Sequence, residues 1–489
     1  MKYAGLSLVA LLAGLGYAQA ADLPTRKASS PPQPSSCFSS FMAYLDSTPA
    51  ECPLTWNGIT LFGTIDVGGG YETHGTSFNR VFQPGVEELI SKNSQGGKWL
   101  ATPNGLSQSQ VGIKINEPVG QGWSIVAQAA LGFDPYSLQL ANGPYSQAMN
   151  TQIPLQFQSS NADSSRAGQW DNSVGFVGVS NATYGTLTAG RQNTLTLDGV
   201  NAYDPMGGSY AFSPIGYSGK VAGAGGTEDA RQNTSLKYMI NVGNFRAGAL
   251  WQWGGYSQGN GSNGEYEAQI GATFNGLSVD GIYSHIVDQV NLGTYNAAQP
   301  SSTPYNALKA TLSNNDSVML LAKYKFGQAT VFGGWEYILY TNPSDTYAWG
   351  FNSVGNFPVV SNATNAGSVN FTAYTHPLVF NAIWTGVKYA FTDKIEGTAA
   401  FYMYNQNDSH NATCTANTVA PAKGFAPQGA NNGACQGNLY AVSAMVDYHP
   451  WKRLDVYAGA MYSAVAGGLA TGYLHTSNID PTVGVRVQF

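Results

Sequence analysis

The segment Val483-Gly484-Val485-Arg486-Val487-Gln488-Phe489 decides the fold of this chain. Its apolar side chains alternate one by one with glycine, arginine and glutamine. In a β-strand successive side chains point to opposite faces, so this order gives one apolar face and one polar face. The segment therefore predicts a strand that meets an apolar medium on one side only.

The same period of two recurs along the chain from Trp56 onward. Residues 110–115, 440–448 and 454–462 alternate in this way. Short turns join the alternating segments in pairs, at 117–122, 180–184, 241–244, 275–276, 327–328, 392–394 and 449–453. Long stretches rich in Gly, Ser and Asn separate the pairs, at 74–105, 134–170, 193–230, 255–264, 288–314, 342–378, 407–436 and 465–479. The pair Asn275-Gly276 is the strongest hairpin signal among the turns.

Short turns at one end and long loops at the other are typical of an outer-membrane β-barrel. Hydrocarbon cannot hydrogen-bond backbone groups, so a sheet within a membrane has to close on itself. The sequence thus predicts an all-β fold, a transmembrane antiparallel β-barrel of about 16 strands with short periplasmic turns and long extracellular loops. A lumen of this width is too wide for side chains to fill, and we expect it to be polar and to hold water. A soluble β-sandwich or adhesin is the alternative, because its strands also alternate.

Composition agrees with a barrel and excludes several other classes of protein. Charged residues are 10% of the 489, against about 25% in ordinary soluble domains. Disordered chains are poor in aromatic residues, which are 12% here. Acidic residues (28) outnumber Lys and Arg (22), so a nucleic-acid partner is not expected. Tyrosines and tryptophans near predicted strand ends suit two interfacial girdles: Trp56, Tyr71, Trp123, Tyr238, Trp251, Trp335, Trp384, Tyr389 and Trp451.

The first 20 residues have the order of an export signal. Lys2 precedes an apolar run over residues 6–15, and Ala18-Gln19-Ala20 fits the small-x-small rule for cleavage. A short membrane anchor is the alternative, but the apolar run is too short to span a bilayer. We expect a signal peptide at 1–20, a periplasmic Pro-rich and Cys-stapled extension at 21–56, and the barrel at 57–489.

The chain has four cysteines, Cys37, Cys52, Cys414 and Cys435, which allow three pairings. Nearness in the sequence favours Cys37–Cys52 and Cys414–Cys435. A metal site is the weaker reading, because no Cys-x-x-Cys spacing is present. A Cys37–Cys52 disulfide would staple a short helix expected within 37–45, as either a plug or an appendage of the barrel.

No catalytic or cofactor pattern in the sequence has the context that it needs. Residues 255–259 match G-x-S-x-G, but the glycine- and asparagine-rich run after them cannot start the helix of a nucleophile elbow. The six histidines show no metal-ligand spacing, and no dinucleotide or phosphate-binding loop is present. We expect no catalytic residues, no metal and no cofactor. An outer-membrane barrel enzyme of the phospholipase or protease type is the main enzymatic alternative.

Several segments resemble the general (diffusion) porins of Gram-negative outer membranes. The resemblance lies in 58–68, 110–114, 176–192, 231–238, 452–457 and 483–489, in the family's order. It is closest to the alphaproteobacterial porins with a Cys-bearing N-terminal extension. The resemblance implies a homotrimer of barrels, a third loop folded into the lumen as an eyelet, and recognition of Phe489 by the barrel-assembly machinery.

The resemblance also implies which residues line the constriction. Loop 3 corresponds to residues 193–230, and Asp204 of the run Asp204-Pro205-Met206-Gly207-Gly208 carries over from the family's loop. Additional acids of the same loop are Asp198, Glu228 and Asp229, which with Asp204 are the acidic candidates. On the opposing wall Arg231 and Arg191 match family positions, and the family has arginines where Gln110 and Ser173 stand. Lys114 and Lys237 of this chain are the further basic candidates.

Together these features predict a water-filled channel for passive diffusion of small hydrophilic solutes and ions. Acids on one wall and cations on the other would set a field across the gap. Because part of the basic cluster is replaced, we expect a weak preference for cations. The expected surroundings are outer-membrane lipid outside and small solutes inside. A substrate-specific uptake channel is a further alternative, which an aromatic ladder along the lumen would favour.

Overall fold

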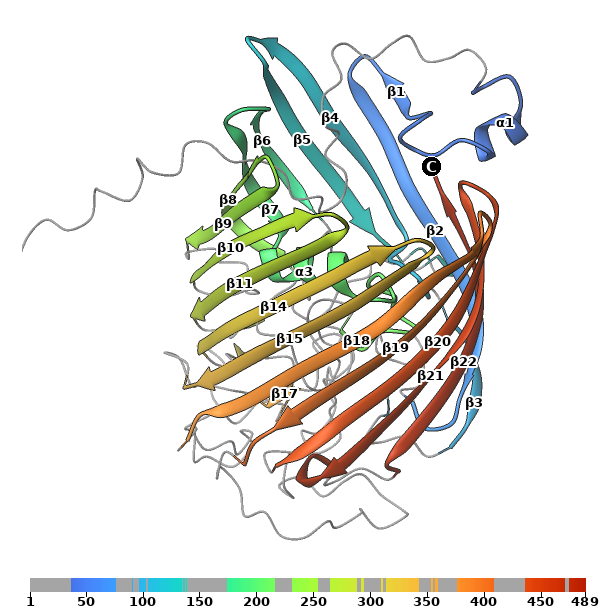
Figure 1. The fold of residues 1–489 in the computed structure, drawn as a ribbon, viewed down its shortest axis with the longest axis vertical. Coiled ribbons are helices and arrows are strands. Elements are labelled where there is room, and N and C mark those ends of the chain that lie inside the picture. Colours follow the sequence, from blue (N-terminus) through green and yellow to red (C-terminus); the bar gives the residue numbers. More distant parts are fainter. Residues whose placement is uncertain are drawn as a thin grey trace, which may run out of the picture.

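Sixteen strands of the described chain form one closed antiparallel ring, which confirms the predicted fold class (Figure 1). The sheet has 18 strands, and two short ones, β1 (Leu54–Trp56) and β3 (Lys98–Ala101), pair with β2 alone. The ring closes where β22 pairs with β2, from Gly70 opposite Thr482 to Thr64 opposite Gln488. Beyond that register, the backbones of Phe489 and Gly63 exchange two hydrogen bonds of 2.9 Å. The C-terminal residue therefore completes the seam of the barrel.

The structure is a computed structural model. It describes residues 37–75, 90, 96–102, 104–133, 135–136, 138, 174–215, 231–253, 264–287, 292–293, 309–310, 314–342, 353–354, 357–358, 376–408, 436–470 and 475–489. The ring consists of β2 (Ile59–Glu72), β4 (Gln110–Gly120), β5 (Trp123–Gly132), β6 (Gly175–Asn181), β7 (Gly185–Asn193), β8 (Arg231–Val242), β9 (Phe245–Trp253), β10 (Gly264–Phe274), β11 (Leu277–Val287), β14 (Asn314–Phe326), β15 (Ala329–Thr341), β18 (Leu378–Thr392), β19 (Ile395–Gln406), β20 (Gly437–Trp451), β21 (Leu454–Gly467) and β22 (Ser477–Gln488). The other elements are α1 (Phe41–Leu45), α3 (Leu195–Tyr203), β12 (Leu292–Gly293), β13 (Lys309–Ala310), β16 (Ser353–Val354), β17 (Phe357–Pro358) and the 3₁₀ turn η2 (Gly468–Ala470). None of the helices in these described ranges is long and apolar enough to cross a membrane.

Burial along the strands is inverted relative to a soluble protein. On β22 the outward Ile479 and Val483 are exposed, whereas the inward Asn478, Asp480 and Thr482 are buried. Exposed valine, isoleucine and leucine recur at every second position on the other strands of the ring. Such a surface is unfavourable in water and favourable in lipid, because apolar groups leave water at a gain of about 25 cal/mol per Å².

All seven predicted turns join neighbouring strands at the same end of the barrel, which we call the short-turn end. The connection from β10 to β11 is Asn275-Gly276, with φ of 47° and 86°. With positive φ at both positions, the twist of the turn matches the twist of the two antiparallel strands that it joins. A side chain at position 276 would also meet the Lys325 carbonyl oxygen at 2.7 Å, so glycine is required there.

The inner wall is more apolar than the expected polar lumen. On the side formed by β9 to β21, inward side chains such as Ile338, Trp384 and Tyr402 are buried in one apolar cluster. The cluster includes Leu195 and Phe212 of the segment that follows β7. The sequence alone does not reveal this apolar wall. An apolar side chain that points into the barrel is expected only where another segment of the chain covers it. Trp384 accordingly points into the barrel and does not belong to an interfacial girdle.

The stapled segment is an appendage and not a plug, since α1 lies outside the ring (Figure 1). The Cys37–Cys52 disulfide is present, as expected. Cys414 and Cys435, like residues 1–36, lie outside the described residues. The α1 helix begins where the Ser40 hydroxyl accepts a hydrogen bond from the Ala43 amide at 3.1 Å.

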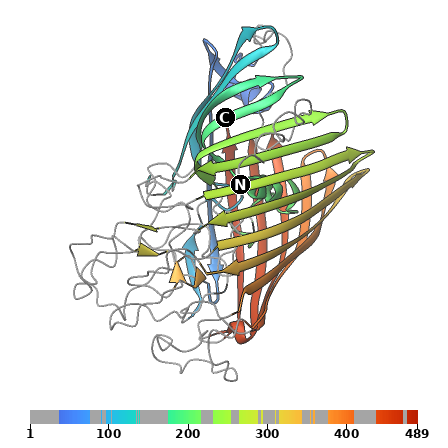
Figure 2. The ribbon, with the colours of Figure 1, turned by 90° about the vertical axis from the view of Figure 1, so that its left-hand side faces the viewer.

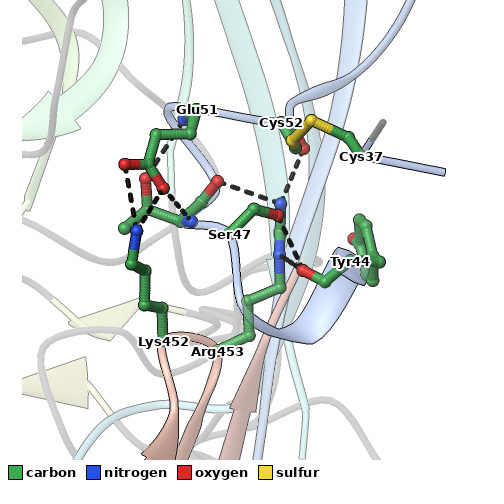
Figure 3. Close-up of a disulfide and its surroundings, with 8 residues drawn as sticks. Cys37, Tyr44, Ser47, Glu51, Cys52, Lys452 and Arg453 are labelled. Atoms are coloured by element: carbon green, nitrogen blue, oxygen red, sulfur yellow. Dashed lines mark hydrogen bonds and ion pairs between the residues drawn. A yellow bond between two sulfur atoms is a disulfide. The ribbon is translucent and has the colours of Figure 1, made fainter. Parts of the chain in front are cut away.

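Arg453, in the turn between β20 and β21, holds the appendage (Figure 3). Its guanidinium donates to three carbonyl oxygens, those of Tyr44 (2.9 Å), Thr48 (3.0 Å) and Cys52 (2.6 Å). It also lies over the Tyr44 ring, 4.0 Å from the centroid. Only 1% of Arg453 is exposed. Beside it Lys452 and Glu51 form an exposed ion pair at 3.1 Å, and hydrogen bonding by the Thr48 amide and then by Lys452 lowers the pKa of Glu51.

We expect Arg453→Ala to release the appendage from the barrel. Hydrogen bonds to a charged group contribute about 1.5–3 kcal/mol each, and the substitution removes three. Hydrogen–deuterium exchange of residues 37–53 should become faster by at least tenfold, while the strands keep their protection. Lys452→Ala is the matched control, since an exposed ion pair contributes about 0–1 kcal/mol. Unchanged exchange in Arg453→Ala would show that the appendage is held by other contacts.

Candidate functional site

The described part of loop 3, residues 194–215 of the connection from β7 to β8, turns into the barrel and packs against its inner wall, with α3 inside the ring (Figures 1 and 2). Its helix α3 contacts β9, β10, β11, β14 and β15. Thr194 caps the helix, because its hydroxyl accepts a hydrogen bond from the Leu197 amide at 3.2 Å. Glu267 from β10 accepts the Leu195 amide at 2.5 Å, as well as the Thr196 hydroxyl at 3.1 Å. A carboxylate at this position interacts favourably with the positive end of the helix dipole.

A cluster of polar side chains fixes the last turn of α3. Arg246 from β9 binds Asp280 of β11 through two hydrogen bonds of 2.8 and 2.5 Å. The same guanidinium donates to the Tyr203 hydroxyl at 2.7 Å, and that hydroxyl donates to Asp280 at 2.5 Å. Lys323 from β14 donates to the Ala202 carbonyl oxygen at 2.9 Å and lies 5.0 Å from the centre of the Tyr203 ring. The end of α3 is therefore tied to three strands at once.

Asp204 ends α3 and organises the turn that follows. Its carboxylate accepts the amides of Met206 (3.2 Å) and Gly208 (2.9 Å) and the hydroxyl of Tyr402 (2.6 Å). Pro205 packs against Gly386 of β18 so closely that a Cβ there would lie 2.5 Å from the proline ring. Asp204 is only 2% exposed. Its carboxylate thus lies in a hydrogen-bonded turn against the wall and does not face open lumen.

Past this turn, loop 3 binds the inner part of the first long loop. The Ser209 hydroxyl and the Ala211 amide both donate to the Gly105 carbonyl oxygen, at 2.7 and 2.9 Å. Asp66 of β2 in turn accepts the amides of Leu106 and Ser107, at 2.7 and 2.9 Å. Loop 3 therefore runs along the inner wall from the β9 side to β2.

Apolar packing contributes more to holding loop 3 than any single hydrogen bond. Leu195, Val200 and Phe212 are each at most 2% exposed. Burying one such side chain stabilises by about 1.5–3 kcal/mol, against about 0.5–1.5 kcal/mol for a hydrogen bond. The polar clusters therefore fix the exact position of a loop that packing already keeps inside.

The predicted opposition of acids and cations is only partly present. Asp198 of α3 and Lys237 of β8 form a direct ion pair, so their charges cancel locally. Arg191 donates to the Asn233 side chain at 2.8 Å and is buried. Lys114 faces inward on β4, 5.8 Å from the centre of the Phe62 ring.

Of the remaining predicted site residues, Arg231 is opposite Asn193 in the register of β7 and β8, and Gln110 is opposite Thr64 of β2. Arg231 and Gln110 are half-buried at the first positions of β8 and β4. Ser173, Glu228 and Asp229 lie outside the described residues, as do the G-x-S-x-G residues 255–259.

Several inward acids and cations were not singled out from the sequence. Arg246 and Asp280 lie near short turns, where a charge in the sequence is usually solvated. The alternation of the strands could have identified them, because both residues occupy positions whose side chains point into the barrel. On the inner wall and loop 3 the described carboxylates are Asp66, Glu72, Asp198, Asp204, Glu265, Glu267, Asp280, Glu336, Glu396, Asp447, Asp455 and Asp480. The described cations there are Lys98, Lys114, Arg231, Lys237, Arg246, Lys323, Lys325, Lys388 and Arg486, whereas Arg191 is opposite Gly175 in the outward phase of β7.

Comparison with known proteins agrees with this geometry. A sequence model of a protein family described as Gram-negative porin matches residues 5–468. The chain belongs to the Gram-negative porins. No curated protein matches it in a sequence search. As a porin it forms a channel in the bacterial outer membrane, and its short-turn end faces the periplasm.

Solved structures show the same fold at low sequence identity. The anion-selective porin from Comamonas acidovorans is 13% identical, with a TM-score of 0.54, and the match covers 88% of this porin and 99% of that chain. OmpT, an outer membrane protein of Vibrio cholerae, is 14% identical with a TM-score of 0.52, covering 89% and 99%. Its trimer form is 13% identical with a TM-score of 0.51, covering 88% and 99%. At this identity the likeness concerns the fold alone.

Proposed function

We propose that this porin passes small hydrophilic solutes and ions by diffusion, past a constriction formed by loop 3, with a weak preference for cations. The observation that carries the proposal is the charge of the inner wall and loop 3, where the described carboxylates outnumber the described cations by a small margin. Several of these acids, such as Glu336 and Asp480, are at most 3% exposed. Fixed charges between low-dielectric walls act on a passing ion more strongly than they would in water.

The Comamonas porin is anion-selective, but at 13% identity its wall charges are not those of this porin. The ion pairs Asp198–Lys237, Arg246–Asp280 and Lys98–Glu72 each cancel. The described acids of the inner wall and loop 3 outnumber the described cations there, and this small excess makes the preference for cations weak.

We expect a reversal potential of cation sign for the purified protein in a planar bilayer under a KCl gradient. Glu336→Gln on the inward face of β15 should move that potential toward zero. Asp316→Asn is the matched control, because Asp316 has the outward phase of β14, where it binds Tyr283 and His285. Anion selectivity of the unmodified protein, or an equal shift in both variants, would refute the proposed role of the inner wall.

A specific uptake channel is not favoured by the aromatic residues on the inner wall. Tyr340, Phe380, Trp384, Tyr402 and Tyr404 face inward, but each is at most 4% exposed. Trp384 donates to the Tyr203 carbonyl oxygen of loop 3 at 3.2 Å, and Tyr402 binds Asp204. These rings support the loop and are covered, so they offer no ladder to a passing sugar.

We further propose that three copies of the chain assemble side by side. The outer face of β4 to β7 carries an apolar groove of about 330 Å³, lined by small and branched side chains including Ile113, Ala127, Ala129, Val177 and Ala189. Small residues let neighbouring walls approach closely. The trimer form of Vibrio cholerae OmpT supports the same arrangement. Native mass spectrometry of the detergent-solubilised protein tests it, and a monomer at every concentration would contradict it.

A further inference from the structure

A polar group that neither the constriction nor the appendage uses lies at the periplasmic mouth of the barrel. Asp447 and His449 are two residues apart on β20 and share its inward face, and Asp455 is inward on β21. The register between these strands shifts between Tyr448 and Trp451, next to the turn. Such irregularities change the direction in which a side chain points. Here the ligand atoms of all three side chains lie within 4.8 Å of one another.

The hydrogen bonds of the group orient the imidazole. His449 Nδ1 lies 2.7 Å from Asp455 Oδ1, while the other oxygen of Asp455 accepts from Arg486 Nε at 2.5 Å. Asp455 is thereby fully engaged. With Nδ1 bound to a carboxylate, the lone pair of the neutral ring is on Nε2. A carboxylate behind a histidine is the usual second partner in metal sites, where it fixes the ring and raises its basicity.

Asp447 is a buried carboxylate with one oxygen that is not hydrogen-bonded in the described part of the chain. It is only 5% exposed, and its Oδ1 has no hydrogen-bond partner among the described residues. Its Oδ2 is 3.9 Å from His449 Nε2, which is too long for a hydrogen bond and leaves room for an ion between the two atoms. Two cations near Asp447 form ion pairs with other carboxylates. Arg486 binds Asp455, and Lys388 binds Glu396 at 2.8 Å. A buried carboxylate without a partner is costly, and a bound cation would remove that cost.

We propose that Asp447 and His449 Nε2 bind a divalent transition-metal ion at the periplasmic mouth, with Asp455 as the positioning residue and water in the remaining coordination positions. An imidazole nitrogen beside a carboxylate oxygen suits Zn²⁺, Ni²⁺ or Cu²⁺ better than Mg²⁺ or Ca²⁺, which take oxygen ligands. With only two protein ligands the site should bind such an ion weakly. The sequence hides the site because its residues do not show the spacing of a helical or zinc-finger motif.

Binding of Zn²⁺ to the untagged full-length protein in detergent tests the proposal without any measurement of conductance. We expect the unmodified protein to bind one more Zn²⁺ per chain, by isothermal titration, than His449→Gln and Asp447→Asn. Asp455→Asn should keep the stoichiometry but weaken binding by about 10–100-fold, the usual effect of losing the partner of a ligating histidine. Co²⁺ should give a visible absorption band in the unmodified protein that His449→Gln abolishes.

His285→Gln is the matched control. His285 also binds one carboxylate, Asp316, at 2.8 Å, but it lies on the outer face of β11, and no second carboxylate joins the pair within a metal-binding distance among the described residues. This variant should bind Zn²⁺ like the unmodified protein. Equal stoichiometry in the unmodified protein, His449→Gln and Asp447→Asn would overturn the proposal, whether or not the channel conducts. Heat-modifiable gel migration shows that each variant is folded.

Discussion

Arg246→Ala is expected to give a channel of larger and more variable conductance with an intact barrel. The substitution leaves the carboxylate of Asp280 buried at 5% exposure without its cation, and it removes a donor from the Tyr203 hydroxyl. Breaking a buried ion pair by removing one partner costs about 3–5 kcal/mol. The loss falls on the last turn of α3, since the backbone ladder between β9, β10 and β11 does not depend on the guanidinium.

Single-channel recordings in KCl measure this effect, and hydrogen–deuterium exchange of residues 195–210 shows where it arises. The double variant Arg246→Met with Asp280→Leu is the control, because replacing both partners of a buried pair by apolar groups is often neutral. It should be closer to the unmodified protein than Arg246→Ala is. If Arg246→Ala left both conductance and exchange unchanged, the Arg246–Asp280–Tyr203 cluster would have no part in holding loop 3.

Asp204→Asn is expected to loosen the turn after α3 rather than to act on selectivity alone. The carboxylate accepts from two amides and from the Tyr402 hydroxyl, whereas an asparagine side chain has one acceptor oxygen and would place its NH₂ group against one of these donors. Losing a hydrogen bond to a charged group costs about 1.5–3 kcal/mol. Faster exchange over residues 204–212 and a wider range of conductance levels should follow.

Tyr402→Phe distinguishes the structural role of Asp204 from the effect of its charge on passing ions. It removes one donor but keeps the carboxylate, so it should loosen the turn less than Asp204→Asn and leave the sign of the reversal potential unchanged. A shift in selectivity by Asp204→Asn without any change in exchange would mean that the carboxylate acts by its charge on passing ions, and that the turn does not depend on it.

The sequence predicts the barrel well because each strand carries its own evidence. Residues 483–489 have two chemically different faces. A two-residue turn such as Asn275-Gly276 forms because these two residue types tolerate the backbone angles that the turn requires. These signals need no knowledge of distant residues. The Cys37–Cys52 disulfide could be predicted for the same reason, because the two cysteines are close in the sequence.

The contacts of loop 3 were harder to predict, because they join residues far apart in the chain. Their places in loop 3 and in the strand after it made Asp198 and Lys237 candidates, but did not show that they bind each other. Arg246 and Arg453 are single charges beside short turns, and nothing nearby distinguishes them from solvated side chains. Their roles follow from Tyr203 and Asp280 in one case, and from carbonyl oxygens 401 to 409 positions away in the other.

We expect the closed ring with its inward loop 3 to enclose a continuous aqueous path. Stepwise ion conductance of the purified, heat-modifiable protein in a planar lipid bilayer measures this directly. Discrete steps of uniform size are expected in KCl, with a reversal potential of cation sign under a gradient. Folded protein that inserts into the bilayer and gives no steps would contradict this expectation.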